Sequence, residues 1–431
     1  MSETEILFDL LKKGVSPVHA VAACEERLLN AGFEKINYED RWELKKGGKY
    51  YLNHHDTTLF AFTLPEEFQT ENNTPAIRIA AAHTDFPCLR IKPSADIKTN
   101  SYAQVNVEVY GGAILNTWLD RPLGIAGRVA VRSKNPFSPE IKNFVSEKNL
   151  LTIPNLAIHM NRDVNKGVEL NKQVDMLPVM GLFADGEGEA DYFLNFLAEE
   201  LQVKKEDILD FELTVYCKEQ PEFIGVRDEF ISGPRLDNLT SCAALISAII
   251  DAKREDGMNV IALFDHEEIG SRSKQGAGSI LLHDMLSRIL ESAGWGEVAQ
   301  QMMYQSMILS VDVAHGLHPN QAGKMDVTNK PVLGGGFCIK EASSQSYATD
   351  CEAIGAIMQI CDERGIPYQK FVNRSDMPGG GTLGSIASAL LPVKTVDVGI
   401  PLLAMHSARE LMGTKDQQAL KNLTEAFFSV K

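Results

Sequence analysis

The chain has 431 residues, of which 44% are hydrophobic, so it can bury more than one core and two domains are expected. Its formal net charge of −16 argues against nucleic acid or an anionic membrane as the partner, since both require a basic surface. The first twenty residues hold no unbroken apolar run, no stretch reaches the length of a bilayer span, and the seven cysteines form no Cys-x-x-Cys pair. We therefore expect a soluble cytoplasmic protein with reduced thiols.

The N-terminal segment is expected to contain helices followed by a hairpin. Ser16-Pro17 predicts a helix start, because proline is favoured at the first helical position, and Gly32 predicts its end. Apolar runs at 49–52 and 58–64 predict two strands joined by a turn at His54-His55-Asp56. No third metal ligand stands at a suitable spacing from these two histidines, so we interpret them as turn residues.

A strand buried on both faces is predicted at 76–82, where the residues are small and apolar. It ends at His83, with Asp85 two positions further on. Residues two apart on a strand point to the same side, so Asp85 can hold the second ring nitrogen of His83 and fix the tautomer that faces a metal. A structural histidine is the equal alternative.

The residue pattern of the sequence changes between about residues 96 and 229. Alternating segments such as 103–110 and 124–131, separated by glycines and prolines, predict a β-rich domain with short turns. On composition alone His159 is a packed or surface histidine, and residues 181–200 are an acidic, solvated segment.

A second run of strands and helices begins near residue 233. Asp237 stands just before a predicted helix at 239–253, where an ordinary N-cap is the alternative to a functional role. An apolar strand at 260–264 then ends in four consecutive ionisable residues, Asp265, His266, Glu267 and Glu268. Adjacent carboxylates at the end of a buried strand repel each other unless a cation shares the site, and a metal is the simplest such cation.

The remaining elements alternate in the same way. The sequence predicts a helix at 280–292, a strand at 307–311 that ends at Asp312, a helix at 348–364, a strand at 368–372, a glycine-rich turn at 378–382, a helix at 383–390, a strand at 393–398 before His406, and a C-terminal helix. Alternating strands and helices imply an α/β sandwich with a largely parallel sheet. In such sheets, sites assemble at the carboxyl ends of the strands.

The candidate ligands are two histidines and several carboxylates without a thiolate. Such a set suits a catalytic zinc site rather than a closed structural one. Five ligands exceed the needs of one zinc ion, but they suffice for two ions if one aspartate bridges them.

Five motifs in order resemble the aspartyl aminopeptidase family of dinuclear zinc exopeptidases: His83-Thr84-Asp85, Gly233 to Asn238, Phe264 to Ser271, Ser310 to His315, and Ala404 to Ser407. The resemblance covers essentially the whole chain. It implies a three-layer zinc-exopeptidase sandwich formed by residues 1–92 and 233–431, with an inserted β-rich dimerisation domain at 93–232.

The resemblance also implies roles for individual residues and an assembly. His83 and Asp312 would bind one Zn²⁺, Glu268 and His406 the other, and Asp237 would bridge them, with Asp85 behind His83 and Glu267 as the general base. The Asp237-Asn238 peptide bond would be cis. The family forms tetrahedral dodecamers, in which His159 of the β-rich domain would reach a neighbouring subunit's site.

The implied substrates are peptides with an N-terminal Asp or Glu. A protein of net charge −16 repels such a residue unless a local cation offsets the repulsion. Lys340 falls where relatives place a substrate-contacting lysine, and Arg374 is a second candidate; a surface ion pair is the alternative for each. Gly380 and Gly381 would approach the substrate closely, and His318, like His315, would orient the intermediate or belong to a packed loop.

Three other functions stay open on the sequence. An aminopeptidase for neutral residues would use the same site. A metal-free glycosidase would also carry paired carboxylates, but it would survive a chelator. An inactive, shell-forming protein that carries cargo would bind no metal.

Overall fold

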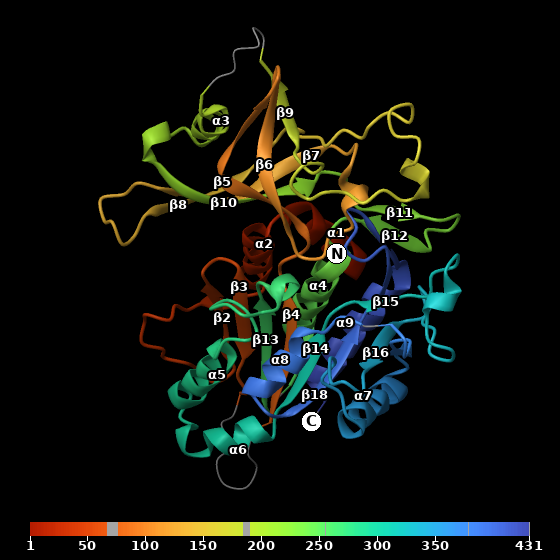
Figure 1. Ribbon diagram of the computed structural model, residues 1–431. Coiled ribbons are helices and arrows are strands. Elements are labelled where there is room, and N and C mark those ends of the chain that lie inside the picture. The colour runs from red at the N-terminus through yellow and green to blue at the C-terminus, as the bar shows by residue number, and fades with distance from the viewer. Residues whose placement is uncertain (67–75, 184–189, 255, 378, 431) are drawn as a thin grey trace. The chain divides into compact units, whose positions relative to one another are not determined.

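The computed structural model describes residues 1–66, 76–183, 190–254, 256–377 and 379–430 (Figure 1). Its contacts divide the chain into two compact units. The first unit comprises Met1–Asp85, Pro221–Met405 and Glu410–Lys431, and the second comprises Phe86–Gln220 and His406–Arg409. The sequence-based boundaries, after residues 92 and 232, lie somewhat further along the chain than these divisions.

The first unit is built on a nine-stranded mixed sheet, as expected. Its strand order is β1-β2-β3-β13-β4-β14-β18-β16-β17, and the four central strands β13, β4, β14 and β18 run parallel. The strands are β1 (Glu34–Lys35), β2 (Lys49–His54), β3 (Thr58–Thr63), β4 (Ile77–His83), β13 (Met258–Phe264), β14 (Met307–Val311), β16 (Phe337–Glu341), β17 (Tyr368–Val372) and β18 (Lys394–Gly399).

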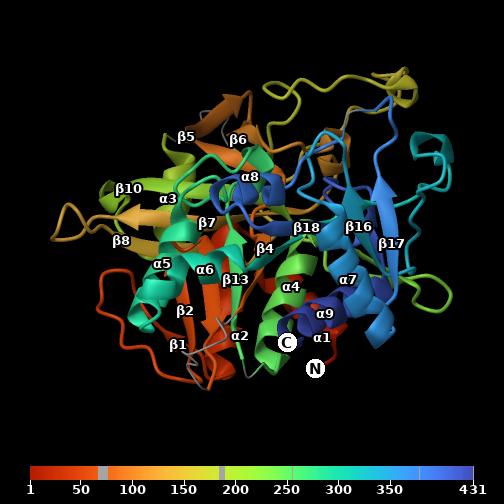
Figure 2. The same cartoon turned by 90° about the horizontal axis from the view of Figure 1, so that it is seen from below.

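Helices cover both faces of this sheet and make it the middle of three layers (Figures 1 and 2). One face packs against α1 (Glu3–Lys13), α2 (Pro17–Asn30), α4 (Leu236–Asp251), α7 (Cys351–Arg364) and α9 (Thr414–Ser429). The other packs against α5 (Leu281–Ser292), α6 (Ala299–Tyr304) and α8 (Leu383–Leu390). Successive residues of β13 enter the two cores in turn, Ile261 in one and Val260 in the other, which is why this strand reads as a continuous apolar run.

A smaller five-stranded sheet completes the first unit. It has the order β11-β12-β20-β19-β15 and consists of β11 (Glu222–Ile224), β12 (Phe230–Gly233), β15 (Ala314–His315), β19 (Pro401–Leu403) and β20 (Glu410–Gly413).

The second unit contains a six-stranded antiparallel sheet in the order β8-β7-β10-β5-β6-β9. Its elements are β5 (Cys88–Thr99), β6 (Tyr102–Tyr110), β7 (Leu123–Val131), β8 (Glu140–Val145), β9 (Val179–Leu182), α3 (Tyr192–Leu201) and β10 (Ile208–Cys217). Gly127 has φ +148°, and a Cβ there would lie 2.0 Å from the carbonyl oxygen of Glu212, so only glycine lets β7 approach β10 this closely.

The interpretation of residues 181–200 as a solvated segment is wrong for its second half. Residues 192–201 form α3, which buries Phe193 and Leu197 in the core of the second unit; residues 184–189 lie outside the described part of the chain. The apolar side chains recur at helical spacing within an acidic composition, and their burial outweighs the local charge.

Short 3-10 helices connect several elements, at Leu115–Trp118, Val164–Lys166, Lys205–Asp207, Glu267–Ile269, Gly296–Val298 and Ala322–Lys324. Among the described residues, no helix has both the length and the apolar character needed to cross a membrane.

Candidate metal centre

Three neighbouring parallel strands deliver the main polar side chains to one edge of the first unit's sheet. His83 is the last residue of β4, and Asp312 directly follows β14. On the other side of β4, the short helix Glu267–Ile269 follows β13, whose last residue, Phe264, pairs in register with His83. The carboxyl ends of parallel strands meet at one edge, so residues far apart in sequence come together here.

His83 lies at the centre of this group and is only 1% exposed. Its Nδ1 is 3.0 Å from the backbone oxygen of Asp85 and 3.3 Å from Asp85 Oδ1. Its Nε2 is 3.5 Å from Asp237 Oδ1 and 3.5 Å from Asp312 Oδ1. One ring nitrogen is thus held by Asp85, and the other faces two carboxylates, which is the arrangement of a metal-ligating histidine.

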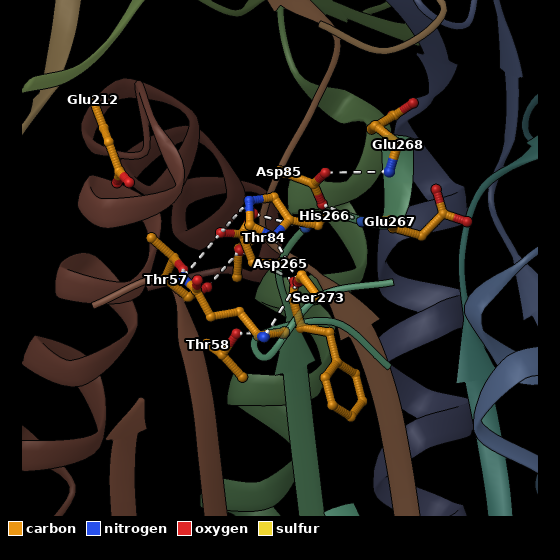
Figure 3. Close-up of polar contacts among 12 residues, drawn as sticks. Thr57, Thr58, Thr84, Asp85, Glu212, Asp265, His266, Glu267, Glu268 and Ser273 are labelled. Carbon is orange, nitrogen blue, oxygen red and sulfur yellow. Dashed lines mark hydrogen bonds and ion pairs between the residues drawn. The ribbon is translucent and has the colours of Figure 1, made fainter. Parts of the chain in front are cut away.

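Asp85 has a second contact that the spacing rule did not predict. Its Oδ1 accepts a hydrogen bond from the backbone N–H of Glu267 at 3.1 Å, and its Oδ2 accepts one from that of Glu268 at 3.2 Å (Figure 3). This buried carboxylate therefore fixes the backbone of the acidic pair as well as the ring of His83.

Asp237 occupies the start of α4 but is not its N-cap. The N-cap position is Arg235, and Asp237 itself has non-helical backbone angles. The Asp237-Asn238 peptide bond is cis, as the resemblance implied. The backbone N–H of Asp237 donates to Glu410 Oε2 at 3.0 Å, and Asn238 Nδ2 donates to the carbonyl oxygen of Val311 at 2.9 Å. The first bond holds the turn to the start of β20, and the second holds it to the end of β14.

Two overlapping sets of donor atoms result within the first unit. The ligand atoms of His83, Asp237 and Asp312 lie within 4.8 Å of one another, and so do those of His83, Glu267 and Glu268. Imidazole and carboxylate donors without a thiolate are the set that a catalytic zinc ion prefers, so the residues present fit the metal.

The electrostatics of the group also favour a cation. Burial, together with the neighbouring aspartates and despite His83, raises the pKa of Glu267 to about 8. Burial and then Asp237 raise the pKa of Glu268. Asp312 behaves differently: burial acts to raise its pKa, but Lys340 and His83 outweigh that effect and lower it to about 2. The crowded carboxylates are therefore costly to ionise together, and a divalent cation would relieve that cost.

His406 belongs to the second unit, in the segment His406–Arg409. It has φ +67°, and its Nδ1 lies 3.2 Å from the backbone oxygen of Gly112. Along the chain it follows Met405 and stands four residues before Glu410, both of which belong to the first unit.

The two candidate cations differ in their surroundings. Lys340 is only 1% exposed; its Nζ donates to the carbonyl oxygen of Val313 at 3.0 Å and lies 4.9 Å from the centre of the Tyr347 ring. Arg374 forms an ion pair with Asp376, with its Nε 2.6 Å from Asp376 Oδ1.

The other candidate substrate residues lie in exposed segments. His159 is exposed in the second unit. His318 is exposed and its Nδ1 accepts a hydrogen bond from the backbone N–H of Asn320 at 3.1 Å, whereas the ring of His315 packs edge-on against Phe371. Gly380 and Gly381 are exposed as well, and a Cβ at Gly380 would meet no atom within 4 Å.

Two buried carboxylates near the group were not singled out from the sequence. Glu410, 2% exposed, holds the backbone of Asp237. Asp397, fully buried, lies within β18 next to the strand that carries Asp312. An acid between two valines of a strand was the available signal for Asp397. Glu410 follows the Ala404 to Ser407 motif by three residues, but nothing in the sequence connects it to Asp237.

A three-layer α/β sandwich with buried histidine and carboxylate ligands at its strand ends defines a metal-dependent hydrolase. The sequence model of the aminopeptidase I zinc metalloproteases, family M18, matches residues 10–428, so the chain belongs to this family. It is accordingly a zinc metalloaminopeptidase, an exopeptidase.

The similarity to known relatives extends along nearly the whole length of the chain. The chain is 43% identical over 426 residues to a probable M18 family aminopeptidase 2 of Clostridium acetobutylicum, covering 98% of each protein. It is similar to a chain in the cryo-EM structure of the Ape4 and Nbr1 complex, with a TM-score of 0.93 and 32% identity over 99% of this chain and 85% of that one. It is also similar to a chain of the S. cerevisiae mApe1 dodecamer, with a TM-score of 0.82 and 25% identity over 99% of this chain and 96% of that one.

Proposed function

We propose that this aminopeptidase holds two zinc ions per chain and removes N-terminal Asp or Glu from peptides. The observation that carries the proposal is the cluster of donor side chains around His83, at the ends of three adjacent strands, which offers more carboxylates than one zinc ion needs. His83 and Asp312 would hold one ion, Glu268 and His406 the other, and Asp237 both. His406 is supported by its position in the sequence. Glu410, four residues later, accepts a hydrogen bond from the backbone N–H of Asp237, the proposed bridging ligand.

Zinc held by these residues would polarise a substrate carbonyl and lower the pKa of a bound water. Glu267 is the general base, which takes a proton from the attacking water and returns it to the leaving amine. The position of Glu267 supports this role. Asp85 accepts a hydrogen bond from the backbone N–H of Glu267, and the carboxylate of Glu267 belongs to the donor group that contains His83.

The acidic preference needs a positive charge within a protein of net charge −16. Lys340 supplies it, with Gly380 and Gly381 approaching the substrate backbone and His318 nearby in the loop after β15. A preference for neutral residues is the second candidate, favoured by the engagement of Lys340 Nζ with the carbonyl oxygen of Val313 beside Asp312.

The proposal is tested by initial rates on peptides that begin with Asp, Glu, Leu or acetylated Asp, each with and without a chelator. We expect chelator-sensitive release from free Asp and Glu and little from the blocked peptide. Release from the Leu peptide alone would keep the chemistry and overturn the acidic preference. Release from no peptide would instead favour an inactive carrier of cargo.

The role of Lys340 is tested with Lys340→Met, which keeps the length of the side chain and removes its charge. We expect the ratio of kcat/KM for Asp over Leu peptides to fall at least about tenfold. The exposed Lys324→Ala is the control. This ratio does not depend on the fraction of active enzyme, so an unchanged ratio would remove Lys340 from specificity even if activity fell.

The chain also assembles, on this proposal, into a homododecamer like that of S. cerevisiae mApe1. The second unit is the oligomerisation domain, and the exposed His159 reaches the site of a neighbouring copy.

A further inference from the structure

Three polar side chains form a row across β14, β18 and β16, on the side of the first unit's sheet that ends at β17. Ser310 of β14 pairs in register with Asp397 of β18, which pairs in turn with Lys340 of β16; these strands can be followed in Figure 1. All three residues are buried, at 0%, 0% and 1% exposure. Ser310 lies two residues before the candidate ligand Asp312, and Lys340 Nζ donates to the carbonyl oxygen of Val313, so the row lies next to Asp312.

The carboxylate of Asp397 connects two separate segments to these strands. Its Oδ1 accepts a hydrogen bond from Thr382 Oγ1 at 2.7 Å, and its Oδ2 accepts one from the backbone N–H of Ala348 at 2.7 Å. The two segments also meet each other, because the backbone N–H of Thr382 donates to the carbonyl oxygen of Ser346 at 3.2 Å. The glycine-rich turn 379–382 and the loop 346–349 therefore share one buried anchor.

The start of α8 packs closely against Ser310 and Asp397. A Cβ at Gly384, in the first turn of α8, would lie 2.6 Å from Ser310 Oγ and 2.8 Å from Asp397 Oδ1. α8 thus begins directly over the row, and the turn that precedes it has little freedom to move while Thr382 stays bonded.

Lys340 balances the charge of the row. Asp312 and Asp397 are the two carboxylates that act on it most strongly, and its Nζ reaches the carbonyl oxygen of Val313, one residue past Asp312. A buried carboxylate without a cation nearby would be strongly destabilising. Lys340 thus interacts both with Asp397, the anchor, and with Asp312, the proposed metal ligand.

We propose that Asp397 is a positioning residue, which fastens the turn 379–382 and the loop 346–349 beside the metal centre so that the turn presents its backbone to the peptide. This inference rests on the proposed function, in which Gly380 and Gly381 approach the substrate backbone. Asp397 does not touch the reacting atoms, and it acts through Thr382 and Ala348.

The experiment compares Thr382→Val with Thr382→Ser in the full-length, zinc-loaded protein. Valine keeps the shape and removes the hydroxyl, whereas serine keeps the hydroxyl. We expect Thr382→Val to lower kcat/KM for the best wild-type peptide by about tenfold, mainly through KM, and serine to recover most of the loss. Zinc content, measured by metal analysis, should match that of the wild type in both.

Equal kcat/KM for Thr382→Val and the wild type would overturn the proposal, and so would a serine variant as impaired as the valine one. Failure of the proposed function would look different, because it would appear in the wild-type protein itself, either as release from no peptide or as release from the Leu peptide alone.

A second pair of variants separates positioning from general loss of stability. Asp397→Asn is compared with Asp416→Asn, since Asp416 is another fully buried carboxylate and accepts hydrogen bonds from the backbone N–H groups of Gly334 and Gly336. We expect only Asp397→Asn to raise KM. If both variants raise KM in step with their loss of thermal stability, Asp397 has no special role in positioning.

Discussion

Asp85 shows how much of the site depends on one side chain. It contacts the ring of His83 and accepts hydrogen bonds from the backbone N–H groups of both Glu267 and Glu268. A candidate ligand from β4 and an acidic pair from the segment after β13 are therefore fixed relative to each other by a single carboxylate. Such supporting contacts orient metal ligands and are as necessary as the ligands themselves.

The general-base role of Glu267 is tested by Glu267→Gln. The change preserves the side chain's shape but removes its capacity to accept a proton, so we expect zinc content near that of the wild type and kcat lower by about 10²-fold or more. Metal analysis and steady-state kinetics on one preparation provide both values, with the exposed Glu39→Gln as the control. Normal turnover in Glu267→Gln would remove Glu267 from this role.

At the scale of elements, the sequence predicted the parts that continuous apolar runs encode. The strand at 307–311 and the helix at 383–390 have the predicted bounds, and three of the candidate ligands follow strands that the apolar pattern marked. β16 was not predicted, because Lys340 and Glu341 interrupt its apolar character. Contacts such as that of Asp397 with Thr382 join residues from different elements, and no local pattern in the sequence reports them.

The packing of α1 against α9 makes a pH-dependent contribution to the stability of the protein. Glu3 is buried, and its Oε1 accepts a hydrogen bond from Gln417 Nε2 of α9 at 3.1 Å. Burial raises the pKa of Glu3 to about 7, although the bonds to Gln417 and Ser247 act to lower it. Because the folded state holds this proton more tightly than the unfolded state, Glu3 makes stability fall as pH rises from about 4.5 to about 7.

Glu3→Gln should therefore be more stable than the wild type at pH 8, by about 2 kcal/mol, and nearly equal to it at pH 4. Denaturant unfolding at the two pH values measures the difference, and the exposed Glu39→Gln should track the wild type. A variant that is less stable than the wild type at pH 8 would contradict the assignment.

On the scale of the whole molecule, the chain consists of a unit that carries the donor groups and an inserted β-rich unit, which is contiguous apart from His406–Arg409. If the second unit drives assembly, light scattering should give the mass of twelve 47.5 kDa chains, about 570 kDa. Chelation tests whether assembly depends on the metal: we expect the mass to persist while activity is lost. A monomeric mass at micromolar concentration would contradict the dodecamer.

The position of β4 in the sheet sets an order of events during synthesis. Both of its neighbours come from much later in the chain, since β13 begins at Met258 and β14 at Met307. At the usual pace of translation, β4 waits on the order of ten seconds or more for its first partner strand. The inserted unit has its own core and is contiguous apart from four residues, so it can fold on the ribosome during that delay. The part of the chain that emerges first is thus completed last, and β4 stays without a partner strand in the meantime.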